Sequence, residues 1–152
     1  MIPKHIVIFS HGFGTLRDAR GLFTDIVKSL PPDILPILFD YNTHDAINNT
    51  ITVPPPSDQA LTLSRIINEV KEKYPGATID LICHSQGCLI AAILAHQGIR
   101  RCIFIAPSMS TDMSSMMDTF RSRPGTTIDT DGWSTLARRA GSKTLIPKEY
   151  RR

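Results

Sequence analysis

Four short apolar runs divide this chain, and segments of helical periodicity lie between them. The runs are rich in β-branched residues and show no alternation with polar positions, which is typical of strands buried on both faces of a parallel sheet. They cover residues 6–9, 34–39, 78–82 and 101–106. Because a predicted helix joins each run to the next, we expect right-handed crossovers and an α/β fold with an open parallel sheet of about four strands.

Two segments, within residues 18–30 and 60–74, repeat apolar residues at spacings of three and four, the period of an amphipathic helix. Residues 88–95 form a continuous apolar run that we also expect to be helical. The first stops at Pro31-Pro32 and the second at Pro75-Gly76, residue pairs that end helices. This order of strands and helices predicts a three-layer α/β/α arrangement, with helices on both faces of the sheet.

Two stretches show neither pattern. Residues 40–57 are rich in Asn and Thr and end in three prolines, and a connection of this length is usually functional, so we expect it to form one wall of a site. Beyond Pro107, methionines interleave with polar residues, which fits either a lid over an apolar pocket or a short helix on the sheet edge. We expect residues 1–107 to form the core, and residues 108–152 a lid-like or irregular basic segment of the same domain without a further strand pair.

The pentapeptide Cys83-His84-Ser85-Gln86-Gly87 lies between an apolar strand and an apolar helix. A serine at such a turn is held on a sharp, strained bend that exposes its hydroxyl, the arrangement called a nucleophile elbow. Small residues two positions either side of the serine let strand and helix approach closely. Gly87 meets this requirement and Cys83 stands where the usual pattern has a first glycine. The alternative is a structural Ser-Gln-Gly turn.

A second motif, His11-Gly12-Phe13-Gly14, follows the first predicted strand. Its glycines let the backbone turn N–H groups toward a developing negative charge, so the motif fits an oxyanion loop. We predict Phe13 and Gln86 as the two N–H donors, with His11, Gly12, Gly14 and Gly87 supporting them. Taken alone, the motif fits an ordinary glycine turn or a phosphate loop equally well.

Together these segments, with Phe39-Asp40-Tyr41, resemble the α/β-hydrolases, in particular small bacterial serine hydrolases of the esterase or lipase type. The resemblance extends over about residues 6–107. It implies hydrolysis of an ester, thioester or amide through an acyl-enzyme at Ser85, without a metal or other cofactor. It also implies the spatial strand order second, first, third, fourth.

In this family the chain order is serine, then acid, then histidine. The only histidine after Ser85 is His96, and eleven residues of helix at about 1.5 Å per residue place it about 16 Å away, out of hydrogen-bond reach. His44 is the remaining candidate for the base and Asp112 for the acid, although a helix-capping role suits Asp112 as well. We therefore expect a C-terminally truncated hydrolase that carries the nucleophile half of the site.

Charge is distributed unevenly along the chain. Residues 1–120 hold nine basic and eleven acidic side chains, whereas residues 121–152 hold eight basic and three acidic ones. The basic end fits a patch for an anionic partner or a solvated lid. Because only Trp133 and Tyr150 supply aromatic rings there, we favour the solvated lid and expect no nucleic-acid partner.

The remaining features concern location and association. No apolar run approaches the roughly 18 residues of a membrane span and no signal pattern opens the chain, so we expect a cytoplasmic location. Cys83, Cys88 and Cys102 lie in apolar segments, which predicts buried free thiols and no metal site. If the strand at residues 101–106 lacks a neighbour, its apolar edge invites self-association.

Three functions fit these observations. The first is a serine hydrolase acting on a small acyl substrate at Ser85. The second is a non-catalytic, truncated hydrolase-fold protein that acts in binding or interaction. The third, a nucleotide-binding module using Gly12 and Gly14, lacks the third glycine of the dinucleotide fingerprint and the lysine motif of a P-loop.

Overall fold

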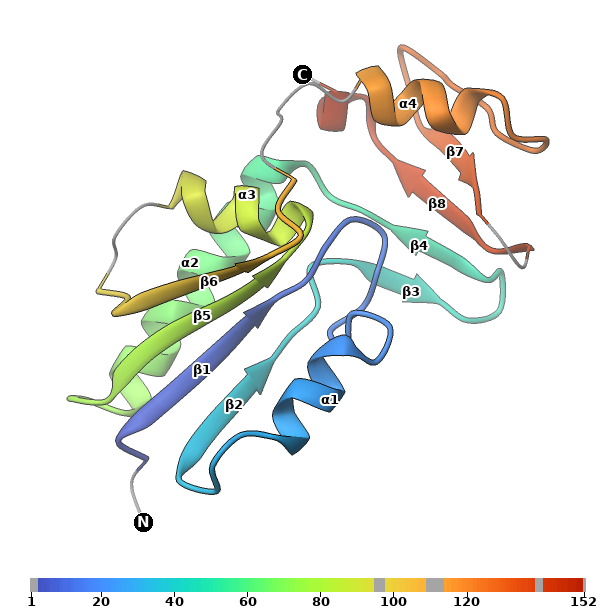
Figure 1. Cartoon of the computed structure of the whole chain (residues 1–152). Coiled ribbons are helices and arrows are strands. Elements are labelled where there is room, and N and C mark those ends of the chain that lie inside the picture. The colour runs from blue at the N-terminus through green and yellow to red at the C-terminus, as the bar shows by residue number, and fades with distance from the viewer. Residues whose placement is uncertain (1–2, 95–97, 109–113, 139–140, 152) are drawn as a thin grey trace.

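The computed structural model describes residues 3–94, 98–108, 114–138 and 141–151. Its larger sheet contains four parallel strands in the order β2-β1-β5-β6 (Figure 1). The strands are β1 (His5–Ser10), β2 (Ile34–Leu38), β5 (Thr78–His84) and β6 (Arg101–Ile105). The parallel sheet and its strand order, second, first, third, fourth among the predicted strands, are confirmed.

Helices cover both faces of this sheet, and the pleat of β1 shows how. Ile6 and Ile8 point into one core, which they share with residues of α2 (Pro56–Lys73) and α3 (Gln86–Ile93). Val7 and Phe9 point to the other face, where they pack against α1 (Leu22–Lys28). Alternate residues of one buried strand thus serve two cores, and the predicted three-layer α/β/α architecture is confirmed.

The first helix is shorter than its apolar period predicts. Residues 17–21 form turns instead, and Ala19, Arg20 and Gly21 have positive φ angles of 48°, 59° and 92°. A left-handed backbone cannot belong to a right-handed helix, so α1 begins only at Leu22. By contrast α2 begins earlier than predicted, at Pro56, because proline at the first helical position needs no N–H partner.

A second four-stranded sheet was not predicted. Its order is β3-β4-β8-β7, with β4 and β8 parallel and the outer pairs antiparallel (Figure 1). Its strands are β3 (Thr43–Asp45), β4 (Thr50–Thr52), β7 (Ser134–Ala137) and β8 (Lys143–Ile146). The expectation of no strand pair beyond Pro107 is therefore wrong, and the connection at residues 40–57 is largely a hairpin. These strands are only three or four residues long, too short to show a period in the sequence.

A third apolar cluster holds this second sheet together. Its buried members are Val53, Met117, Leu136, Ile146 and Tyr150. Met117 belongs to α4 (Ser114–Arg121) and Tyr150 to the short 3-10 helix η2 (Lys148–Arg151). Of the two alternatives for the methionine-rich stretch, the described part is a helix that packs on a sheet, although the sheet is the second one.

One edge of the parallel sheet, β6, is exposed. Cys102, Ile103 and Phe104 all face solvent, with Ile103 49% and Phe104 39% accessible. Cys83 and Cys88 are buried, as expected. The expectation of a buried thiol is wrong for Cys102, because β6 is an edge strand with a neighbouring strand on only one side. Across the described parts of the chain, no helix has the length and apolar character needed to cross a bilayer.

Candidate active site

The register of the parallel sheet brings the two sequence motifs together. Ser10 at the end of β1 pairs with Cys83 near the end of β5, so the loops that follow leave the sheet side by side. Ligand sites in open α/β sheets gather at this carboxyl edge. The structure therefore places Ser85 and the loop at residues 11–14 at one edge, on neighbouring strands.

Ser85 occupies the turn between β5 and α3 with φ 53° and ψ −122°. A non-glycine residue in this region carries about 1–3 kcal/mol of backbone strain and persists only where its surroundings fix it. Its N–H donates to the carbonyl of Ile105 (3.0 Å), and its own carbonyl accepts from the N–H groups of Cys88 (3.0 Å) and Ser108 (3.1 Å). These three bonds hold the strained residue in place.

Two glycines allow this close packing. A Cβ atom on Gly87 would lie 2.2 Å from the carbonyl oxygen of Ser10, and one on Gly12 would lie 2.9 Å from Cβ of Ser85. Neither contact is sterically allowed, so α3 can meet β1, and the loop can meet the serine, only with glycine at these positions. Cys83 is accommodated instead of glycine because its side chain is buried in the core on the α2 and α3 face.

The two predicted N–H donors lie on either side of this contact, Phe13 in the loop and Gln86 at the first position of α3. Among the described residues neither backbone N–H donates a hydrogen bond. Gly14 has φ 57°, and its carbonyl accepts a hydrogen bond from the guanidinium of Arg138. The carbonyl of Gly14 therefore points toward Arg138, which follows β7.

Tyr150, near the end of the chain, contacts the turn around Ser85 through Gln86, a contact that the sequence did not reveal. Its hydroxyl accepts a hydrogen bond from the buried side-chain amide of Gln86, and its ring packs against that of Phe13 at 5.4 Å. Burial raises the pKa of Tyr150, so the phenol stays neutral. The sequence hints at this contact only in that Tyr150 is an aromatic residue among charged ones.

His11 is a structural residue of the loop. The N–H of Tyr41 donates to Nε2 of His11 (2.9 Å), so Nδ1 carries the proton and donates to the carbonyl of Gly12 (3.0 Å). Burial lowers the pKa of His11, which favours the neutral ring. Because both nitrogens have partners, this histidine holds the loop in shape and has no nitrogen left to accept a proton from Ser85.

The other histidines are placed differently. His44 is exposed on β3 of the second sheet, and among the described residues no hydrogen bond joins it to Ser85. His84 lies beside the serine with a buried Nδ1 that lacks a partner within the described chain, and burial and then the charge of Arg20 lower the pKa of His84. Asp112 and His96 lie outside the described residues. No group of three His, Cys, Asp or Glu side chains placed to hold a metal ion occurs in the described ranges.

Comparison with known families agrees with this geometry. A family model described as alpha/beta hydrolase fold matches residues 5–139. The chain belongs to the α/β-hydrolase family. No curated protein matches it. In this α/β-hydrolase the two motifs found in the sequence, around Gly12 and Ser85, meet at one sheet edge, whereas the contributions of Tyr150 and Arg138 come from segments that gave no motif.

Proposed function

We propose that this α/β-hydrolase is a serine hydrolase that acts on a small carboxylic ester or related acyl substrate through an acyl-enzyme at Ser85. The observation that carries the proposal is the strained backbone of Ser85 opposite Gly12, next to two N–H groups without partners in the described chain. Strain of this kind clusters at active sites, since it fixes a reactive side chain in position.

In the proposed reaction, Oγ of Ser85 attacks the acyl carbon and its proton passes to a base. The substrate oxygen becomes negatively charged, and the N–H groups of Phe13 and Gln86 stabilise it as hydrogen-bond donors. Collapse of the tetrahedral intermediate expels the alcohol or amine and leaves an ester on Ser85, which water then hydrolyses. No metal or other cofactor is required for these steps.

The base is the incomplete part of this proposal. Among the described residues no histidine nitrogen is hydrogen-bonded to Oγ of Ser85, and roles for His44 as base and Asp112 as acid stay predictions. Without a base, the oxyanion donors and substrate binding leave a residual acceleration of about 10³ to 10⁴ over water. We therefore expect this chain to turn over activated esters slowly.

Labelling with a fluorophosphonate tests the nucleophile directly, because the reagent forms a covalent bond to an activated serine. We expect the unmodified chain to be labelled and the Ser85→Ala variant to remain unlabelled. Ser108→Ala is the matched control, since Ser108 is exposed and its backbone N–H, which the variant keeps, donates to the carbonyl of Ser85. Equal labelling of the unmodified chain and Ser85→Ala would contradict the proposal.

The absence of a histidine contact to Ser85 within the described residues favours a second candidate, a hydrolase-fold protein that binds without turnover. The two functions differ with p-nitrophenyl acetate. A serine hydrolase releases more than one equivalent of p-nitrophenol, and this release is lost in Ser85→Ala. A binding protein gives no release that depends on Ser85. Neither candidate calls for a nucleic-acid partner, and a cytoplasmic location stays a prediction.

A further inference from the structure

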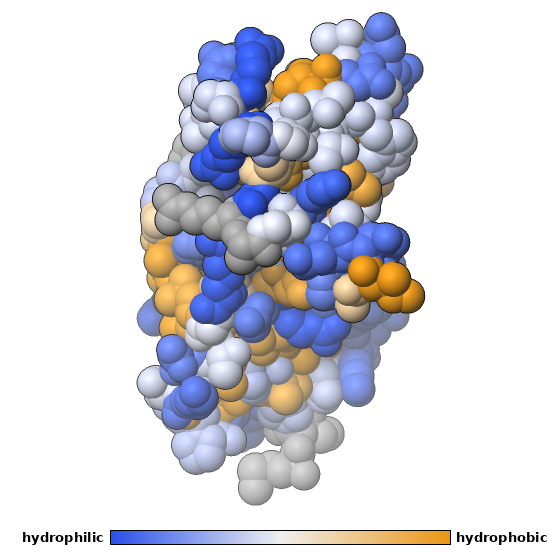
Figure 2. Space-filling view, turned by 90° about the vertical axis from the view of Figure 1, so that its right-hand side faces the viewer, coloured by the Kyte–Doolittle hydropathy of each residue, from blue (hydrophilic) through white to orange (hydrophobic). Residues whose placement is uncertain are grey.

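A recess of about 570 Å³ lies between the loop after β1 and the C-terminal elements. One wall is formed by residues 14–16, 18 and 20, and the other by Ile51, Phe120, Arg123, Arg138 and Ser142. Pockets of this volume hold small molecules. We call this recess the arginine pocket. Figure 2 shows one side of the molecule, where hydrophilic residues lie among separate apolar areas.

The lining carries unbalanced positive charge. Arg20, Arg123 and Arg138 face a single carboxylate, Asp18. Within the described residues none of these three arginines forms an ion pair. Their neighbours behave differently, because Arg17 pairs with Asp40 and Arg121 with Asp118. The pocket therefore brings together three guanidinium groups that form no ion pair in the described chain, a pattern that suits an anionic ligand.

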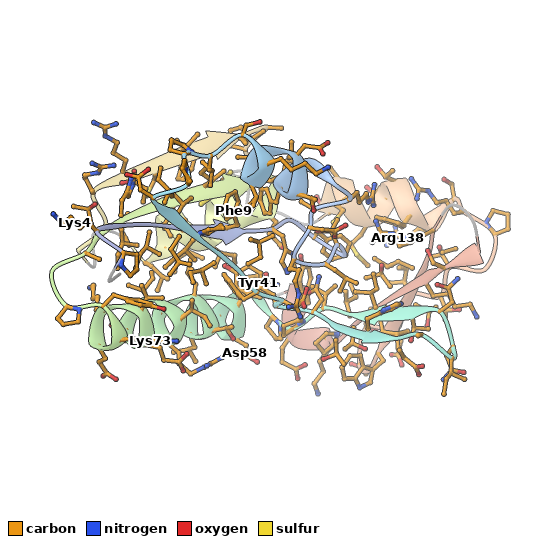
Figure 3. All side chains as sticks on the ribbon, turned by 90° about the horizontal axis from the view of Figure 1, so that it is seen from below. Lys4, Phe9, Tyr41, Asp58, Lys73 and Arg138 are labelled. Carbon is orange, nitrogen blue, oxygen red and sulfur yellow. The ribbon has the colours of Figure 1, made fainter. Side chains whose placement is uncertain are left out.

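Fixed contacts hold two of these guanidinium groups in place. Arg138, labelled in Figure 3, donates to the carbonyl of Gly14 and to Oγ1 of Thr144 (3.1 Å). Arg123 stacks over the ring of Phe120 at 4.4 Å. Burial, and then the positive charges of Arg20 and Arg123, lower the pKa of Arg138, so both neighbouring charges disfavour the charged form of Arg138. An anion placed among the three groups would offset this effect.

The third arginine is positioned by strained backbone. Ala19 and Arg20 are consecutive residues with left-handed φ angles, and the turn that contains them is closed by two hydrogen bonds to the carbonyl of Asp18, from Gly21 and Phe23 (both 3.0 Å). Such strain persists where the surroundings fix it, and it clusters at ligand sites. In this turn it brings Arg20 to the rim of the pocket.

The pocket also adjoins the serine. Gly14 lines it, and Gly12, two residues earlier, contacts Ser85. Consecutive Cα atoms are about 3.8 Å apart, so Gly12 and Gly14 lie within about 8 Å of each other. A small substrate can therefore reach from one to the other. Leu16, Ile51 and Phe120 add apolar surface to the lining of the same pocket.

We propose that the arginine pocket binds the anionic end of the substrate, a carboxylate or phosphate group, through Arg20, Arg123 and Arg138, while the acyl carbon lies at Ser85. This inference rests on the proposed function of Ser85 and names its substrate class, esters or amides that carry an acidic group. Guanidinium groups bind both anions with paired hydrogen bonds, so the test distinguishes between them.

Isothermal titration calorimetry of the full chain with inorganic phosphate, and separately with succinate, tests the binding. We expect saturable binding of at least one anion, weakened about tenfold or more by Arg123→Gln and by Arg20→Gln, since each removes a charged hydrogen-bonding group. Arg121→Gln is the matched control, because it removes the same charge two residues from Arg123 and outside the pocket. The anion that binds more tightly identifies the acidic group.

A second measurement links the pocket to the serine. The bound anion should slow fluorophosphonate labelling of the unmodified chain, and Ser85→Ala should bind the anion as tightly as the unmodified chain does. The inference would be overturned if neither anion binds, or if Arg121→Gln weakens anion binding as much as the pocket variants do. It would also be overturned if the bound anion does not change the labelling rate. If the anion binds but Ser85 is not labelled, the proposed serine hydrolase is contradicted, whereas anion binding by the arginine pocket is supported.

Discussion

The two ends of strand β5 are built in opposite ways. At its amino end, Asp80 accepts hydrogen bonds from Nε (2.9 Å) and Nη2 (2.5 Å) of Arg100, and Nε2 of His5 lies 2.9 Å from the same carboxylate. At its carboxyl end, Ser85 has a strained backbone. There, Oε1 of Gln86 is buried without a partner in the described chain. One end of the strand satisfies its polar groups, and the other leaves them strained or unpaired.

This difference separates stability from function within one element. Paired charges and satisfied hydrogen bonds stabilise a fold, whereas strained and unpaired groups cost free energy that the rest of the structure must offset. The carboxyl end is therefore expected to lower the free energy of unfolding while it positions Ser85, the proposed nucleophile. The amino end is expected to raise that free energy without affecting the proposed reaction at Ser85.

The largest effect is expected from Gly87→Val. The new Cβ atom would lie 2.2 Å from the carbonyl oxygen of Ser10, and this backbone cannot yield without separating α3 from β1. We expect a loss of more than about 3 kcal/mol in the free energy of unfolding, measured in urea, and loss of labelling at Ser85.

Gly21→Ala is the control for this variant. It meets no atom within 4 Å and is affected only by its φ of 92°. It should therefore lose only about 1–2 kcal/mol. A stable, labelled Gly87→Val variant would show that the helix does not need this close approach.

Asp80→Asn tests the amino end. It removes the charge that Arg100 and His5 share, and because Arg100 is well exposed we expect a loss of only about 1–2 kcal/mol in the free energy of unfolding. The labelling rate of Ser85 should not change. Asp25→Asn, which breaks an exposed pair with Lys28, should cost less. A change in labelling rate in Asp80→Asn would mean that the two ends of β5 are coupled.

The same variant predicts a pH dependence. Hydrogen bonds from Arg100 lower the pKa of Asp80 below its usual value, so the folded state favours the charged carboxylate. A lowered pKa stabilises the fold above the pKa of the unfolded chain, and this stabilisation is lost as the pH falls through the folded pKa. The stability difference between the unmodified chain and Asp80→Asn should be constant above about pH 5 and shrink below about pH 4. A constant difference down to pH 2 would contradict the ion pair.

A smaller effect of opposite sign is expected from Ser85→Gly. Glycine adopts φ 53° and ψ −122° without strain, so the variant should gain about 1 kcal/mol in the free energy of unfolding while it loses all labelling. Ser85→Ala keeps the strain and should lose labelling without this gain. If glycine gives no gain over alanine, the serine turn is not strained in solution.

The smallest effect on stability is expected at the side of the sheet, in Ile103→Lys. Ile103 is 49% accessible on the exposed β6 edge, so its replacement should change the free energy of unfolding by less than about 0.5 kcal/mol. Such an apolar edge can pair with another chain, and we predict that the unmodified chain self-associates at micromolar concentration and that lysine reduces this association. Light scattering measures both, and a monomeric unmodified chain would contradict the prediction.

The sequence predicted those parts of the molecule whose signal lies within one short segment. The four parallel strands are continuous apolar runs, and the positions of Ser85 and Gly12 at the strand ends follow from motifs of four or five residues. The second sheet gave no such signal, because its short strands are stabilised by partners far away in the chain. Arg123 and Arg138 belong to a basic stretch that we interpreted as a solvated lid. Their convergence with Arg20 depends on the fold and cannot be read from a local segment.

The parallel pairing of β4 with β8 has a consequence for the order of folding. Thr50 pairs with Lys143, so this contact closes a loop of 93 residues that contains the whole turn around Ser85. Closing such a loop costs about 4 kcal/mol of chain entropy unless the parallel sheet has already drawn its ends together. The second sheet should therefore form after the first and open before it. Amide hydrogen exchange should accordingly be faster in β7 and β8 than in β1 and β5.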